Sequence, residues 1–268
     1  MTDRIRQILV ILGVVVMVLS SLWLGDSLDQ GSDPTPVYFL PFGLTFAIWG
    51  AIYSGSVLYA IYQALPTQTS RNLHRAVGGW AALNYWLTAL WNFTAGQAGS
   101  ESTAEFQPIF VLLTVPILLG MLYSLTRTFI YFRRGHANLN PTDRWLAQVP
   151  LTIFFAWLNV ATIANTTAAL DAVGITGEPN GGLIAAALLL VALLLASAMV
   201  LFTRAGIGTI AYALVIVWAA FGILMNNLER STPVIVMSLA VIVVTIIVTW
   251  FHFANRPAEL SARQLTSS

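Results

Sequence analysis

Apolar residues gather in eight stretches along the chain, and short connections separate them. A helix needs about 20 predominantly apolar residues to cross the hydrocarbon core of a bilayer. Because no water reaches backbone groups there, each stretch must satisfy its own hydrogen bonds as a helix. The sequence therefore predicts an all-α integral membrane protein with about eight transmembrane helices. The expected spans are residues 8–24, 38–63, 76–95, 107–131, 146–168, 182–203, 208–226 and 233–252.

The first stretch also has features of a cleavable signal peptide. Arg4 and Arg6 precede its apolar run, and Ser20 and Ser21 interrupt that run near its end. The run continues to Leu24, however, which gives it about 17 residues, more than the roughly 7–15 of a signal-peptide core. We therefore expect the segment to be retained as the first transmembrane helix.

Composition supports a membrane protein and leaves no room for a soluble domain. Of the 268 residues, 57% are hydrophobic and only 9% are charged, whereas soluble domains carry about 25% charged residues. The mean hydropathy is +0.78. The net charge is only +1, so no nucleic-acid partner is expected. The absence of cysteine excludes disulfides, thiolate metal sites and a cysteine nucleophile.

The charges predict an orientation for the helices. All twelve basic residues are arginines, and arginine is retained in cytoplasmic loops. Eleven of the twelve fall at the termini or in alternate loops, and only Arg230 falls on the opposite side. Eight of the eleven acidic residues lie in those opposite loops. We therefore expect an inner-membrane protein with both termini in the cytoplasm and a flexible cytoplasmic tail over residues 255–268.

The centres of the spans carry no ionisable residue. Proton pumps, ion channels and transporters of charged substrates ordinarily need such residues there, so these classes are disfavoured. No recognised catalytic or metal-binding motif occurs either, and we assign no catalytic residue and no metal ligand. His74 lies at a predicted helix end, where we expect it to be solvated.

Aromatic and amide side chains share one face in each of two predicted helices. Residues three, four or seven apart lie on the same side of a helix. Such a face either packs against a neighbouring helix or lines a cavity, and the pattern alone favours packing. The two faces comprise Phe46, Trp49 and Tyr53 in the second stretch and Trp157, Ala161 and Asn165 in the fifth.

Several polar groups lie near the middle of their spans. Trp49, Trp157 and Trp218 are too deep to be interface anchors. A buried indole N–H needs an acceptor, which a neighbouring helix or a ligand can supply. In the third stretch, Asn84 lies near the middle and Trp91 follows seven residues later. The usual partner of an amide at this depth is another helix.

Two longer segments and one short one carry a family resemblance. Residues 40–54 contain a proline and then Trp-Gly-x-x-Tyr, and residues 156–165 contain Ala-Trp-x-x-x-Ala-Thr-x-x-Asn. Between them, Leu83-Asn84 precedes a run of aromatic residues. These segments resemble the second, fifth and third helices of the tryptophan-rich sensory protein or translocator protein (TspO/MBR) family.

The resemblance implies a five-helix bundle over residues 1–172, with a ligand pocket between its helices that the loop of residues 25–37 closes. Members of the family bind porphyrins, haem-like tetrapyrroles and, in animals, cholesterol. Residues 173–254 add three helices, as in longer bacterial members. The sixth and eighth stretches are expected to be lipid-facing scaffold or an oligomer contact. The expected ligand-binding residues are Phe46, Trp49, Tyr53, Asn84, Trp91, Trp157, Ala161 and Asn165.

The chain departs from the family pattern in places that alter the shape of such a pocket. The family's Trp-x-Pro-Pro segment reads Tyr38-Phe-Leu-Pro41 here, and its proline two residues before the helix-two tryptophan is Ala47. Residues 166–171 lack the aromatic and basic pair of the cholesterol motif. No sterol recognition of the animal kind is therefore expected.

The resemblance and the residues together predict a membrane-embedded sensory or binding protein for a flat, hydrophobic ligand. A porphyrin or haem is the expected ligand, and no other cofactor is assigned. Two alternatives stay open, a transporter of an uncharged hydrophobic molecule and an enzyme that degrades porphyrin with a pocket tryptophan. The expected partners are the lipid bilayer and a hydrophobic small molecule, with a homodimer as a further option.

Overall fold

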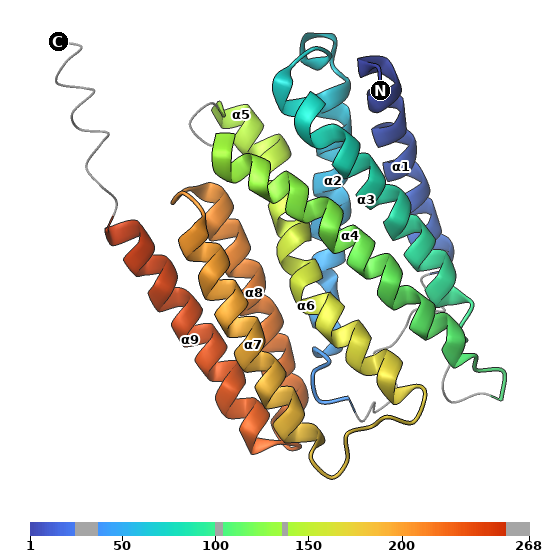
Figure 1. The fold of residues 1–268 in the computed structure, drawn as a ribbon, viewed down its shortest axis with the longest axis vertical. Helices are drawn as coiled ribbons and strands as arrows, with labels where there is room; N and C mark the ends of the chain where they lie inside the picture. The colour runs from blue at the N-terminus through green and yellow to red at the C-terminus, as the bar shows by residue number, and fades with distance from the viewer. Residues whose placement is uncertain (25–36, 100–103, 136–138, 256–268) are drawn as a thin grey trace.

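The computed structural model describes residues 1–24, 37–99, 104–135 and 139–255, and the regular structure in these ranges is entirely helical (Figure 1). The predicted all-α membrane fold is confirmed. The expected closing loop at residues 25–37 and the tail at 255–268 lie outside these ranges, apart from one residue each. In chain order the elements are α1 (Asp3–Leu24), the 3-10 helix η2 (Gly43–Ala47), α2 (Ile48–Ala64), the 3-10 helix η3 (Pro66–Gln68), α3 (Asn72–Gly96), α4 (Pro108–Gly135), α5 (Pro141–Asp143), the π-helical turn η5 (Arg144–Gln148), α6 (Val149–Asp171), α7 (Gly181–Phe202), α8 (Ile207–Asn227) and α9 (Thr232–Ala254).

Seven helical segments of the described chain are long and apolar enough to cross a membrane, and α3 is the remaining long helix. With 25 residues α3 has sufficient length, but its polar side chains lower its hydropathy. Asn84, Thr88 and Asn92 of this helix are buried inside the protein. Because α3 packs between α1 and α4, these groups are shielded from lipid. The seven apolar segments are those of α1, α2, α4, α5 to α6, α7, α8 and α9.

The starts of α1, α2, α3 and the α5 to α6 segment differ from the predicted spans by four residues or more, and two of these differences have a local cause. The second span was expected from residue 38, but the backbone at Phe42 is extended (φ −56°, ψ 144°) and α2 begins at Ile48 after η2. Pro41 contributes, since the residue before a proline is disfavoured in a helix. The fifth span was expected from residue 146, but Asn140 and Asp143 form a capping box that starts the helix five residues earlier, at residue 141.

Five helices form a closed ring. Going round it, α1 packs on α2, α2 on α6, α6 on α4, α4 on α3 and α3 on α1. In Figure 1 these helices occupy the blue-to-yellow part of the bundle. The ring therefore has an interior that is separate from the surface a bilayer would cover.

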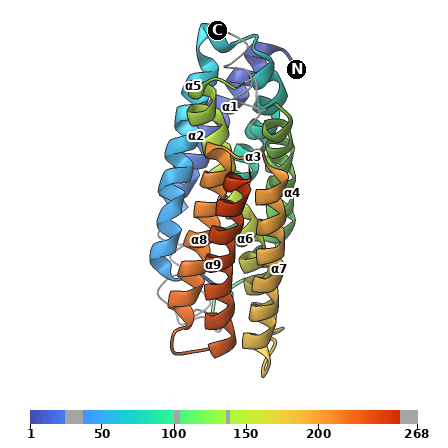
Figure 2. The ribbon, with the colours of Figure 1, turned by 90° about the vertical axis from the view of Figure 1, so that its left-hand side faces the viewer.

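The last three helices form a second group beside this ring (Figure 2). Both α7 and α8 pack on α9, while α8 also packs on α6 and η2. Of the most apolar window of α8, 61% of residues are buried, against 28% in α7 and 22% in α9. Helix α8 therefore makes most of the contact between the two groups.

A buried ion pair fastens the end of the ring at which α1 begins, here called the N-terminal end. The Asp143 carboxylate accepts hydrogen bonds from both terminal nitrogens of Arg71, at 2.7 and 2.6 Å, and from the Tyr62 hydroxyl at 2.6 Å. The hydrogen bonds to Asp143 raise the pKa of Arg71 above its ordinary value, so this guanidinium stays charged. The pair joins α2, the turn before α3 and the start of the α5 to α6 segment.

The interior at the N-terminal end is more polar than the sequence predicted. His74 is fully buried, and its Nε2 lies 3.1 Å from Gln68 Oε1. The rings of Tyr59 and Tyr62 lie 5.9 and 5.3 Å from its imidazole. The prediction of a solvated His74 is wrong, because the η3 turn and two tyrosines of α2 cover it.

Candidate functional site

The ring encloses a cavity of about 70 Å³ in the half of the bundle away from the N-terminal end. Its walls come from α2, α3, α4 and α6 and from the segment that leads into η2. Ala161, Ala164 and Ala168 of α6 line it. Larger side chains at these positions would fill the space that the alanines leave empty. No charged residue lines this cavity within the described chain.

Aromatic rings dominate the cavity and centre on Trp49. Its indole stacks on Trp91 with centroids 6.3 Å apart and an interplanar angle of 22°. It meets Trp157 nearly at a right angle, 81°, at 6.4 Å. Phe46 in turn sits edge-on to Trp157 at 5.8 Å. Such offset-stacked and edge-to-face pairs each contribute about 0.5–1.5 kcal/mol beyond the burial of their area.

The helical spacing in the sequence explains why these rings meet. Trp49 and Tyr53 lie one turn apart on α2 and stack at 5.4 Å. On α6, Trp157, Ala161 and Asn165 recur every four residues and all line the cavity. These aromatic faces, for which the pattern alone favoured helix packing, therefore both pack against neighbouring rings and line the cavity.

Two hydrogen-bond donors in this cavity lack a partner. The indole N–H groups of Trp91 and Trp157 are buried, and neither has a hydrogen-bond acceptor among the described residues. Leaving such a group unsatisfied costs about 1–3 kcal/mol. The third polar group, Asn165, donates its Nδ2 to Thr114 Oγ1 on α4 at 2.7 Å, which leaves its amide oxygen as an acceptor. Two of the rings that line the cavity therefore carry an N–H group without an acceptor among the described residues.

Six of the eight residues expected to bind ligand line the cavity. Tyr53 does not, but it supports Trp49 by stacking on it. Asn84 lies elsewhere in the ring interior: it is fully buried on α3, and its amide has no hydrogen-bond partner among the described residues. The six residues brought together are Phe46, Trp49, Trp91, Trp157, Ala161 and Asn165.

The sequence analysis missed the contributions of α4 and of the segment before η2. Val111 and Leu118 of α4 line the cavity, but aliphatic residues seven apart on an apolar helix give no distinguishing signal. Leu40 and Pro41 also line it. Pro41 carried a signal, because it interrupts an otherwise apolar run and thereby marks backbone that is not helical.

Comparison with known proteins identifies the family of the chain. A family model described as TSPO-like protein matches residues 4–251. The chain belongs to the TSPO-like protein family. No curated protein and no solved structure matches it. The matched residues include α7, α8 and α9, so the family pattern in this TSPO-like protein extends over both helix groups.

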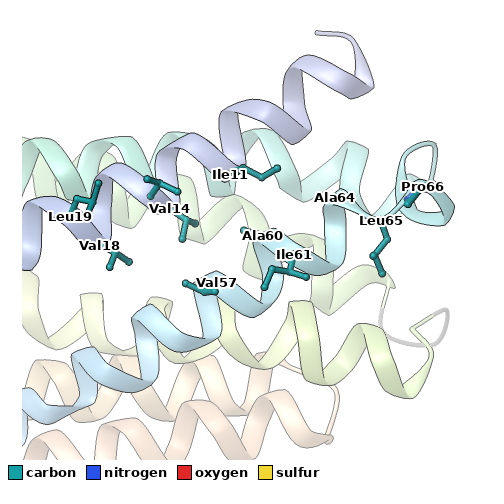
Figure 3. A pocket seen from close by; sticks show the side chains of 11 residues that line it. Ile11, Val14, Val18, Leu19, Val57, Ala60, Ile61, Ala64, Leu65 and Pro66 are labelled. Carbon is teal, nitrogen blue, oxygen red and sulfur yellow. The ribbon is translucent and has the colours of Figure 1, made fainter.

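The TSPO-like protein also has a larger hollow, of about 560 Å³, between α1 and α2 (Figure 3). Val14 and Val18 of α1 lie across it from Val57 and Ile61 of α2. Every residue that lines it is apolar, and Ile61 is 59% exposed on the outside of the ring. A ligand site ordinarily places a few polar groups to orient its ligand. This hollow has none, so we place the candidate site in the ring cavity.

Proposed function

We propose that this TSPO-like protein is a sensory or binding protein of the membrane that takes up a flat, largely apolar ligand in the ring cavity. The ligand would carry hydrogen-bond acceptors on its edge, as a tetrapyrrole does. The observation that carries the proposal is that Trp91 and Trp157 line an aromatic cavity and that their indole N–H groups have no acceptor among the described residues. An acceptor on the ligand would satisfy a donor whose burial otherwise costs free energy.

The size of the cavity limits how such a ligand enters. Sites for small molecules usually have roughly 300–1,000 Å³, and the cavity has about 70 Å³. A tetrapyrrole therefore requires that part of the wall move outward. The ring helices pack on each other, whereas Leu40 and Pro41 lie in backbone without regular structure that leads into the short 3-10 helix η2. We propose that the segment leading into η2 is the part of the wall that moves outward when a ligand enters.

Orientation in the membrane follows from the distribution of arginine. Arg71, Arg133 and Arg204 all lie beside the ends of helices at the N-terminal end of the bundle. Since arginine is retained on the cytoplasmic side, we propose an inner-membrane protein whose N-terminal end faces the cytoplasm. Ligand would then approach the cavity from the other half of the membrane.

Replacing Trp157 by phenylalanine is expected to weaken binding of protoporphyrin IX about five- to tenfold, because one donor and part of the ring surface are lost. Trp49→Phe is expected to act similarly through lost stacking. Titration of the purified protein, followed by the shift in porphyrin absorbance, measures the affinity. Haem is titrated in the same way.

The matched control is Trp250→Phe on α9, whose side chain is 64% exposed and far from the cavity. Its affinity should equal that of the wild type. Equal affinities of Trp49→Phe, Trp157→Phe and Trp250→Phe for both porphyrin and haem would show that the cavity is not the site.

A further inference from the structure

Helix α8 holds the backbone of the cavity wall. Trp218 Nε1 donates to the Thr45 carbonyl at 2.9 Å, and Asn226 Nδ2 donates to the Leu40 carbonyl at 2.8 Å. The amide of Phe42 donates to the Gly222 carbonyl at 2.9 Å. A fourth hydrogen bond runs from Asn227 Nδ2 to the carbonyl of residue 38, at 2.8 Å. Residues 38–47, here called the wall segment, are thus bonded to α8 at four points.

Three of the four residues of α8 that make these hydrogen bonds form a single stripe. Trp218, Gly222 and Asn226 are spaced by four residues, so they lie one above another on one face of the helix. That face meets the wall segment over about two turns. Trp218 and Asn226 donate to its backbone, and neither lines the cavity.

Gly222 sets how closely α8 approaches the wall segment. A Cβ atom at this position would lie 2.7 Å from Thr45 Cγ2 and 2.8 Å from Thr45 Cβ, closer than atoms normally come. Thr45 is itself only 2% exposed and cannot turn away freely. The close approach of two backbones brings the indole of Trp218 within reach of the Thr45 carbonyl.

The wall segment in turn shapes the cavity. Leu40, Pro41 and Phe46 line it, and Phe46 packs its ring edge-on against Trp157. The hydrogen bonds from α8 hold the backbone carbonyls of residues 38, 40 and 45. They therefore also fix the positions of these lining side chains. The cavity therefore has its volume of about 70 Å³ while the wall segment is bonded to α8.

We propose that α8 positions the cavity wall and that release of the wall segment from α8 opens the cavity. Trp218, Asn226 and Asn227 are positioning residues, and the C-terminal helix group thereby controls access to the site. The inference rests on the proposed function for its meaning, since an opened cavity would admit a flat apolar ligand. Its geometry is independent of what that ligand is.

A thiol reporter tests the inference without any ligand. The chain has no cysteine, so Ala161→Cys places a single thiol in the cavity, and its rate of reaction with N-ethylmaleimide is followed by mass spectrometry. Trp218→Phe or Asn226→Leu in this background is expected to raise the rate about fivefold, as the loss of one neutral hydrogen bond allows. Trp250→Phe on α9 is the matched control and should leave the rate unchanged.

A second reporter separates opening of the cavity from general loosening. Ala147→Cys places the thiol at a fully buried position in η5, at the N-terminal end. Faster labelling at position 161 alone supports the proposal. Equal acceleration at both positions, or no acceleration at 161, overturns it. If labelling at 161 accelerates but neither porphyrin nor haem binds any variant, the proposed ligand class is wrong while control by α8 stands.

Discussion

Replacing Asp143 by alanine is expected to destabilise the protein by about 3 kcal/mol, one of the largest effects of a single substitution in this chain. The side chain of Asp143 is fully buried, and its loss leaves the Arg71 guanidinium and the Tyr62 hydroxyl without their carboxylate. The estimate is at the lower end for a broken buried pair because Arg71 is 31% exposed and water recovers part of its solvation. Unfolding by sodium dodecyl sulfate, followed by circular dichroism, measures the loss.

An exposed ion pair at the same end of the bundle supplies the control. Arg75 bonds to Asp3 at 2.6 Å, but its side chain is 53% exposed. Exposed pairs contribute little to stability, so Arg75→Gln should leave the unfolding curve nearly unchanged. If Asp143→Ala unfolds at the same sodium dodecyl sulfate concentration as the wild type, the buried pair does not stabilise the ring.

Replacing Gly222 by alanine is expected to cost about 1–3 kcal/mol of stability through overpacking and to open the cavity. The added methyl group overlaps the side chain of Thr45, which is buried against α8. The wall segment must then move away from α8, so the thiol of Ala161→Cys should react faster. Both the free energy of unfolding and the labelling rate are measured on the same variant.

Two further variants make this result specific. Gly50 lies on α2 with nothing within 4 Å of the position its Cβ would take, so Gly50→Ala should leave stability and labelling unchanged or slightly raise stability. Thr45→Gly removes the side chain that the new methyl group meets, and it should restore slow labelling in Gly222→Ala. Fast labelling that persists in the double variant would show that α8 and the wall segment are not coupled at this contact.

Much of the fold and part of the site could be predicted from the sequence. Each apolar stretch predicts a helix, because a segment that lies in lipid must satisfy its backbone hydrogen bonds internally. The spacing of Phe46, Trp49 and Trp157 predicts aromatic faces, and the family resemblance brings those faces together. Periodicity fixes which residues share a face of one helix, but not how far that helix is rotated or shifted against its neighbours. Asn84 was expected in the site for this reason, yet it lies away from the cavity.

The role of α8 could not be predicted, because its contacts join residues far apart in the chain. Trp218 and Thr45 are 173 residues apart, and Asn227 and the residue it bonds are 189 apart. The sequence indicated that the indole of Trp218 needs an acceptor at mid-span, but it did not identify that acceptor. The acceptor is the Thr45 carbonyl in η2, and only the packing of α8 on η2 reveals it.

The most direct test of the account is an experimental structure determined with protoporphyrin IX bound. We expect the macrocycle inside the ring, in contact with Trp49 and Trp157, with a polar edge accepting from an indole N–H and with the wall segment displaced from α8. A macrocycle in the hollow between α1 and α2, or one seated in the ring with the hydrogen bonds from Trp218 and Asn226 unchanged, would contradict it.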